Sequence, residues 1–304
     1  MDLSVTKITD LPESVKNLRN LKTLKMAYTF LPKFPKDMVN LKNLEEIDFS
    51  FCRNLEWEVH CDISGLSSLR VLRLSSSNVA GLPQRICHLS HLQTLDVGKC
   101  KQLQALPELP SSLLSLCWGS KNMAVPELTS LTNLKELCLS DDERPEAGSS
   151  NQTPNIEWIT RLPSLETLEL ALPNVTNLPG NFSALTQLRE LSLSYMKELD
   201  LTQLPLSPSL WTLHLKRCRI QEPKFSGLNY LSELELEDCN LAEIDGLEDL
   251  KLLEVLKISR CNSVTNLKGL KDLRRLRKLK GIFSAHPSLP EFDKPIELDI
   301  CLGA

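Results

Sequence analysis

Apolar residues return along this chain of 304 residues at a nearly constant spacing. A short pattern occurs twelve times, with leucine at its first position, an aliphatic residue at its fourth and, in most cases, an apolar residue at its sixth. Its first leucines are Leu21, Leu44, Leu69, Leu92, Leu113, Leu134, Leu165, Leu188, Leu210, Leu231, Leu253 and Leu276. Successive starts lie 21 to 25 residues apart, except for one gap of 31 residues. A unit of this size cannot bury its apolar face alone, so we expect stacked units that share one core.

Each unit has two halves with different periods. The leucine pattern alternates apolar and polar positions, which predicts a short strand with one buried face. The second half begins with a proline and places apolar residues three apart, as in Pro12, Val15 and Leu18. Proline is tolerated where a helix begins, so this half predicts a short helix or turn. The expected fold is an α/β solenoid, a leucine-rich-repeat horseshoe with parallel inner-wall strands and short outer helices or turns.

The same pattern predicts the domain organisation. Residues 1–283 form one leucine-rich-repeat domain of about twelve full repeats and a truncated first one. Polar residues at 141–155 fill the long gap and predict an inserted loop, which either carries binding residues or is inert. Residues 284–304 form a C-terminal tail that supplies a last strand or cap. Because Met1 falls inside a repeat, we expect a fragment of a larger protein or association through the N-terminal end.

Composition narrows the partners and the compartment. Hydrophobic residues make up 41% of the chain but aromatic residues only 5%, which suits narrow aliphatic coils. The formal net charge of −4 gives no attraction to nucleic acid or to an anionic membrane, so neither is an expected partner. No segment approaches the ~18 consecutive apolar residues of a membrane span. The first residues contain no apolar signal segment, which predicts a cytoplasmic location.

Five of the ten cysteines recur at the same position of their repeats. They lie eight residues after a repeat's first leucine and are Cys52, Cys100, Cys218, Cys239 and Cys261. We expect them to be buried, reduced thiols that pack as small apolar side chains. The sequence contains no cysteine or histidine cluster with metal-ligand spacing, no phosphate loop and no catalytic constellation. We therefore expect no catalytic residue, no cofactor, no metal and no enzyme activity.

Two segments carry a resemblance to a known family. Residues 8–15, Ile-Thr-Asp-Leu-Pro-Glu-Ser-Val, and residues 100–113, which include Pro-Glu-Leu-Pro-Ser-Ser-Leu, are similar to the leucine-rich-repeat region of plant intracellular nucleotide-binding disease-resistance proteins of the TIR class. The resemblance covers nearly the whole chain. It implies a non-catalytic protein-recognition module in plant defence and signal transduction. Its implied protein partner is a pathogen effector, a guarded host protein or a nucleotide-binding switch domain that it restrains.

The family's own phosphate loop ends in Gly-Lys followed by serine or threonine. Gly98-Lys99-Cys100 departs from that pattern, so the receptor's nucleotide-binding activity does not carry over to this chain. A free-standing intracellular leucine-rich-repeat signalling scaffold is the alternative, because such scaffolds share the Leu-Pro phrase that opens the second half of each repeat.

Partner recognition is expected on strand side chains that point away from the core. The sequence places them four and seven residues after each repeat start. Aromatic and arginine residues dominate the binding energy of protein interfaces. The partner-binding candidates are Tyr28, Phe51, Arg73, Tyr195, His214, Arg217, Glu235 and Arg260.

Charge is unevenly distributed near the end of the chain. Residues 233–249 are acidic and residues 268–280 are basic. This asymmetry indicates either a dipolar docking surface or solvated positions that keep the solenoid from aggregating.

Overall fold

The chain folds into two compact units, Met1–Ser150 and Asn151–Ala304. The computed structural model describes residues 1–57, 60–120, 127–141, 154–175, 178–199, 209–220, 225, 227–241, 244–261, 264, 267, 269–283, 289–292 and 295–302. Most of the predicted inserted loop, residues 142–153, lies outside the described residues. The predicted boundary between a repeat domain at 1–283 and a tail at 284–304 stays a prediction.

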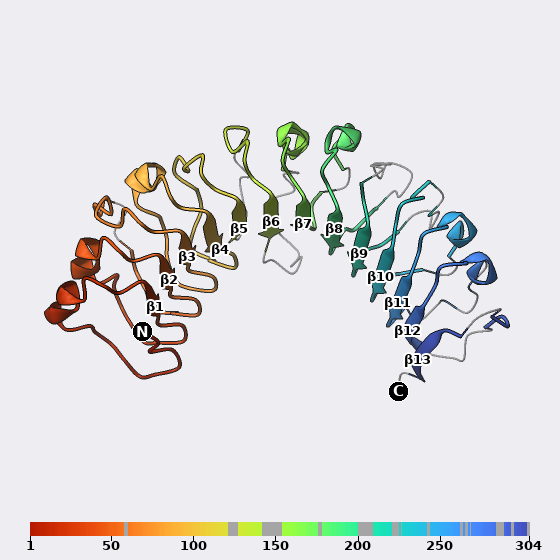
Figure 1. Ribbon diagram of the computed structural model, residues 1–304, viewed down its shortest axis with the longest axis horizontal. Coiled ribbons are helices and arrows are strands. Elements are labelled where there is room, and N and C mark those ends of the chain that lie inside the picture. The colour runs from red at the N-terminus through yellow and green to blue at the C-terminus, as the bar shows by residue number, and fades with distance from the viewer. Residues whose placement is uncertain are drawn as a thin grey trace. The chain divides into compact units, whose positions relative to one another are not determined.

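The first unit is built on parallel strands that pair in the order of the sequence (Figure 1). Each begins two residues after a repeat's first leucine, so that the fourth residue of the repeat is the second residue of the strand and is buried. The strands are β1 (Thr23–Lys25), β2 (Glu46–Asp48), β3 (Val71–Arg73), β4 (Thr94–Val97), β5 (Ser115–Ser120) and β6 (Glu136–Asp141).

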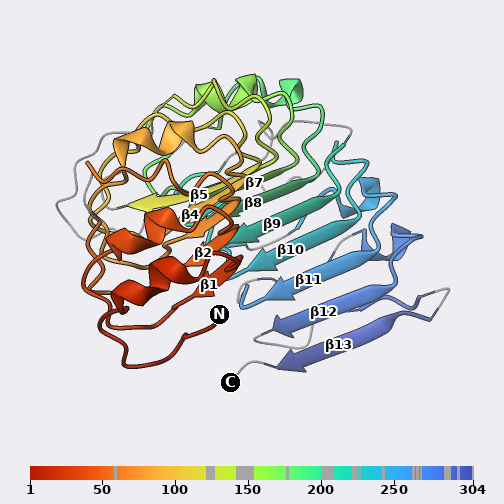
Figure 2. The ribbon, with the colours of Figure 1, turned by 60° about the vertical axis from the view of Figure 1, so that its left-hand side comes forward.

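The second unit repeats this arrangement, and Figure 2 shows its strands side by side. All of its neighbouring strands pair in parallel. The strands are β7 (Thr167–Ala171), β8 (Glu190–Ser194), β9 (Thr212–Lys216), β10 (Glu233–Glu237), β11 (Val255–Ser259), β12 (Lys278–Phe283) and β13 (Glu297–Leu302). The strand β13 follows the last full repeat and pairs with β12 through six residues.

Short 3-10 helices form the side of each unit opposite the strands (Figure 1). Their apolar residues recur every three positions, which matches the three residues per turn of a 3-10 helix. Pro12, Pro35 and Pro83 precede the first three of them, and the amide of the leucine that follows closes the turn, as Leu41 does onto Met38 at 2.9 Å. The helices are η1 (Glu13–Asn17), η2 (Lys36–Asn40), η3 (Gln84–His88), η4 (Glu157–Arg161), η5 (Phe182–Ala184), η7 (Leu247–Asp249) and η8 (Leu270–Asp272).

The expected leucine-rich-repeat solenoid, with parallel strands and short helices opposite them, is thus confirmed. The leucines at the first and fourth positions of the repeats are buried, except Leu21, which is partly exposed. Leu213, Leu234 and Leu256 are fully inaccessible. Among the described residues, no helix has the length and apolar character needed to cross a membrane.

The residue that lies eight positions after each repeat's first leucine, which we call the eighth position, forms a ladder of small hydrogen-bond donors. All five cysteines at this position are buried free thiols, as expected. Each thiol donates to the carbonyl of the sixth residue of the preceding coil, for example from Cys52 to Met26 at 3.1 Å and from Cys239 to Leu215 at 3.3 Å. In the first full repeat Thr29 occupies this position, and its hydroxyl donates to the Met26 carbonyl of its own coil at 2.9 Å. The position therefore satisfies a buried carbonyl as well as filling space.

Candidate functional site

The outward side chains of β8 to β12, together with the residues that directly follow these strands, form what we call the strand surface of the second unit. On β8 to β11, leucine or isoleucine points into the core and alternates with a partly exposed residue. On β12 the buried positions are Leu279, Gly281 and Phe283. The parallel register aligns these outward positions across neighbouring strands. His214 of β9 therefore lies beside Glu235 of β10, and Glu235 lies beside Lys257 of β11.

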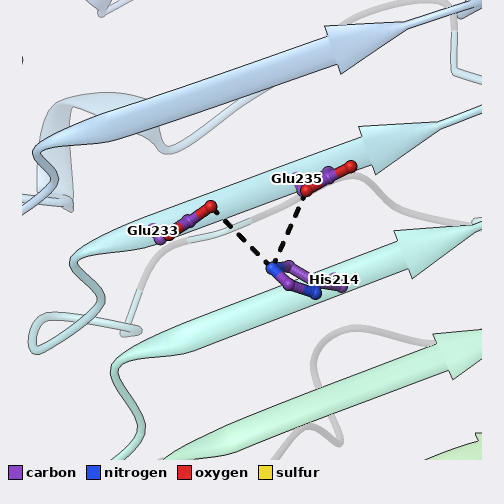
Figure 3. Close-up of side chains that lie close together, drawn as sticks. All are labelled: His214, Glu233 and Glu235. Carbon is purple, nitrogen blue, oxygen red and sulfur yellow. Dashed lines mark ion pairs between the residues drawn. The ribbon is translucent and has the colours of Figure 1, made fainter. Parts of the chain in front are cut away.

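His214, Glu233 and Glu235 converge on this surface (Figure 3). The Nε2 atom of His214 lies 4.0 Å from Oε1 of Glu233 and 3.8 Å from Oε2 of Glu235. This nitrogen is buried and has no hydrogen-bond partner among the residues that the structure describes. The three groups could each offer one ligand atom to a metal, and these atoms lie within 4.8 Å of one another. Zinc holds nitrogen and oxygen ligands at about 2.0–2.2 Å, so the group would have to contract only slightly around an ion.

The ammonium group of Lys257 already takes the position that such a cation would need. It donates to Oε1 of Glu233 at 2.6 Å and lies 3.3 Å from Oε2 of Glu235, the same two oxygens that face His214. The hydrogen bond with Glu233 raises the pKa of Lys257 above its ordinary value, so the ammonium stays charged at neutral pH. We therefore interpret the group as a charge network with its own cation rather than as a metal site.

A second pair of interactions lies toward the ends of the same strands. Lys216 of β9 forms an ion pair with Glu237 of β10 at 2.7 Å, and Arg260 also contacts Glu237. The hydrogen bond from Lys216 holds the pKa of Glu237 below its ordinary value. Glu237 is the least exposed member, with 18% of its side chain accessible, so its charge is compensated inside the surface.

Tyr195, Arg217 and Asp238 form a row where β8, β9 and β10 end. The guanidinium group of Arg217 donates from Nε to Asp238 at 2.9 Å and from Nη1 to the Tyr195 hydroxyl at 3.3 Å. Its Cζ atom also lies 5.5 Å from the centre of the Tyr195 ring, within range of a cation–π interaction. Tyr195 stays 42% exposed, so the row presents an aromatic ring held by a neighbouring arginine.

This row has an unusual backbone. In eight of the twelve repeats, the residue seven positions after the repeat start adopts a left-handed φ angle, for example 63° at Tyr195 and 52° at Arg217. Residues other than glycine rarely adopt such angles. The left-handed residue turns the chain out of the strand, and its side chain is left at the strand end rather than in the core.

The first unit presents a smaller set of candidates. Tyr28 and Phe51 stack with their ring centres 4.3 Å apart and their planes within 6°. The Nη1 atom of Arg73 lies 2.5 Å from Oε1 of Glu46, which also faces Lys25 at 3.9 Å. Tyr28 is 51% exposed. The predicted candidates of this unit therefore form one aromatic pair and one ion pair.

The structure brings several sequence-predicted residues together. Tyr195 contacts Arg217, His214 lies beside Glu235, and Tyr28 stacks on Phe51. The exposure of the predicted residues agrees with the orientation expected from the repeat, whereas their role in binding stays a prediction.

Sequence reasoning missed other members of the surface. Glu233 and Glu237 occupy the third and seventh positions of their repeat, and strand alternation could have placed them on the outward face beside Glu235. It also missed Trp211 and Tyr230, which precede β9 and β10 and are 60% and 50% exposed. Aromatic residues are rare in this chain, so a large aromatic residue just before a predicted strand was the sequence signal that could have identified both.

Comparisons with known proteins support the fold. No protein-family model matches the chain, and no curated protein matches it by sequence. A leucine-rich-repeat protein from Leptospira interrogans is similar in structure, with a TM-score of 0.61 and 24% identity over 92% of this chain and 77% of its own. An internalin, InlF from Listeria monocytogenes, has a TM-score of 0.61 and 18% identity over 93% of this chain and 74% of its own.

A third similar structure is the functional domain of InlJ from Listeria monocytogenes, which is described as including a cysteine ladder. Its TM-score is 0.53, with 19% identity over 91% of this chain and 62% of its own. At these identities the likeness extends to the fold alone. The structural neighbours of this chain are leucine-rich-repeat proteins.

Proposed function

We propose that the chain is a non-catalytic protein-recognition module of plant intracellular immunity. In this proposal it binds a pathogen effector or a guarded host protein, or it restrains a nucleotide-binding switch domain. The strand surface of the second unit carries the proposal, because it presents Tyr195, His214, Arg217, Glu235 and Arg260 from adjacent strands. The resemblance of residues 8–15 and 100–113 to plant resistance proteins supports the finer assignment to immunity.

The contacts on this surface favour recognition over stability. Ion pairs between exposed side chains contribute only about 0–1 kcal/mol each, so a network of them is a weak source of folding free energy. It does hold long side chains in fixed positions. Side chains that are ordered before binding lose less conformational entropy when a partner arrives. The Tyr195–Arg217–Asp238 row combines this order with an exposed aromatic ring and an arginine, the residue types that most often dominate interfaces.

The cysteines support a cytoplasmic location as part of the same proposal. All ten are free thiols, and the buried ones at the eighth position of the repeat act as hydrogen-bond donors. Free thiols persist in reducing compartments, whereas secreted proteins of this cysteine content usually form disulfides.

The test is affinity capture with the purified chain from extracts of infected and uninfected plant tissue. The wild-type chain is compared with the double variant Tyr195→Ala/Arg217→Ala. Arg85→Ala, which removes an exposed arginine from η3 in the first unit, is the matched control. We expect wild type and the control to retain a common protein that the double variant loses.

The identity of that protein separates the two function classes. A pathogen protein, a guarded host protein or a nucleotide-binding domain supports the proposal. Retention of signalling enzymes alone, equally from infected and uninfected tissue, would favour the scaffold. If all three chains retain the same proteins, the strand surface of the second unit is not the binding surface.

A further inference from the structure

A hollow of about 420 Å³ opens in the first unit. It lies at the turns that follow β2, β3 and β4. The residues that define it are Phe51, Arg53, Ser76, Asn78, Lys99 and Lys101. We call it the cationic hollow.

The repeat explains why a hollow forms there. Phe51, Ser76 and Lys99 are the left-handed residues of three consecutive coils, with φ angles of 61°, 58° and 56°. Their backbones therefore turn in the same way, and the three coils stack in register. The middle coil carries only short side chains at this turn, among them Ser76 and Asn78, while the coils on either side carry long ones. The space between the long side chains stays open.

Positive charge is concentrated around this space. Among the described residues that line the cationic hollow, Arg53, Lys99 and Lys101 are cations and none is a carboxylate. Two aspartates on neighbouring strands accept hydrogen bonds from backbone amides. Asp48 accepts a hydrogen bond from the amide of Ser50 at 2.9 Å, and Asp96 accepts one from the amide of Gly98 at 3.0 Å. The concentration is local, because the chain as a whole has a formal charge of −4.

The hollow also has an apolar side and neutral donors. The ring of Phe51 is held by its stacking on Tyr28, with 4.3 Å between ring centres. The hydroxyl of Ser76 and the amide of Asn78 lie at the middle coil, between the flanking cations. A ligand that fits would carry a compact anion beside a short apolar stem.

We propose that the cationic hollow binds the phosphate group of a phosphorylated side chain on a partner protein. Such a phosphate carries about −1.5 to −2 charges at pH 7 and three acceptor oxygens, which suits three cations better than a single carboxylate does. The guanidinium fork of Arg53 matches two of those oxygens. A protein ligand is favoured over nucleic acid because the cations form one patch, not a track that follows a phosphate backbone. The inference rests on the proposed function only in assigning the phosphate to a partner protein.

The test is calorimetric titration of the full chain with a short peptide that contains one phosphoserine. The unphosphorylated peptide and inorganic phosphate are titrated in parallel. Asn78→Asp keeps the shape of the side chain and places a carboxylate among the cations, so we expect at least a tenfold loss of affinity. Lys99→Gln and Lys101→Gln should each weaken binding about fivefold. Lys42→Gln, which removes an exposed lysine elsewhere in the first unit, should leave the affinity unchanged, and thermal unfolding confirms that each variant is folded.

Each result supports or overturns the proposal. Competition between inorganic phosphate and the phosphopeptide, with weaker binding of phosphate alone, supports it. The proposal is overturned if the phosphopeptide does not bind, or if it binds no more tightly than the unphosphorylated peptide or inorganic phosphate. It is also overturned if wild type and Asn78→Asp bind the phosphopeptide with equal affinity. Tighter binding of single-stranded RNA than of the phosphopeptide also overturns it. Tyr195→Ala/Arg217→Ala should keep phosphopeptide binding, so failure here is distinct from failure of the proposed function.

Discussion

Single residues on the strands divide into two energetic classes. Leucines at the fourth position of the repeat, such as Leu213, are fully buried, and their removal leaves a cavity that the rigid coils cannot fill. Outward residues such as Tyr195 and Arg217 contact one another at the surface and remain 42% and 48% exposed. The core residues therefore determine stability, and the outward residues are free to determine recognition.

Leu213→Ala is predicted to lower the free energy of unfolding by about 2–5 kcal/mol because of the cavity. Tyr195→Ala/Arg217→Ala should lower it by less than about 1 kcal/mol, since exposed ion pairs contribute little. Urea unfolding followed by circular dichroism measures both. Equal destabilisation by the two variants would show that the outward side chains are part of the core.

Glu237 gives a prediction for pH. Its folded-state pKa lies below the ordinary value of 4.5, chiefly because of the hydrogen bond from Lys216. The contribution to stability is therefore complete above pH 4.5 and is lost as the pH falls through the lowered folded-state value. Glu237→Gln should reduce the loss of stability with acid in that range. Thermal unfolding from pH 6 to pH 3 measures the difference, and parallel curves for wild type and variant would refute it.

The elements show how much of the fold the sequence predicts. Twelve strands begin two residues after the predicted repeat starts, because each leucine motif forms the strand of one coil. Proline followed by apolar residues three apart likewise predicted the short helices. The pairing of Lys257 with Glu233 and Glu235 was not predictable, since it depends on how long side chains of different coils bend toward one another.

The left-handed residues were also beyond the sequence pattern. A series that contains Tyr28, Phe51 and Arg260 shares no side-chain property that would reveal a positive φ. Asparagine or glycine would have signalled it, but the solenoid imposes this conformation on bulky residues too. Tertiary stacking, rather than local preference, determines the turn.

The strand ends allow a direct test of this strain. Asp238 has a φ of 55° and accepts the hydrogen bond from Arg217. Asp238→Val should destabilise the chain by about 1–2 kcal/mol, because a β-branched residue is costly in this region. Asp238→Asn keeps an acceptor and a residue type that tolerates the conformation, so it should be close to neutral. Chemical unfolding measures the free energy of unfolding of both variants. Equal stability of the two would exclude backbone strain as a cause of destabilisation in Asp238→Val.

At the scale of the whole molecule, the repeat places buried cysteines at the same position in coils of both units. Cys52 and Cys100 lie in the first unit and Cys218, Cys239 and Cys261 in the second, all buried at the eighth position. The thiolate is the reactive form of cysteine. Burial raises the pKa of the Cys100 thiol, and the hydrogen bond with Cys218 raises the pKa of Cys239 to about 12. Cys301 of β13, by contrast, is exposed.

Alkylation of the native chain at pH 8 should therefore modify Cys301 within minutes and leave the five ladder cysteines unmodified. All five thiols are buried and lack access to the reagent, so they should react only when their own coils open. The raised pKa values of Cys100 and Cys239 lower their thiolate fraction further. Peptide mapping by mass spectrometry with and without guanidinium chloride follows each site, and Cys301→Ser removes the fast reaction as a control. Native alkylation of Cys100 or Cys239 as fast as that of Cys301 would mean that the eighth-position ladder is open to solvent and does not belong to the core.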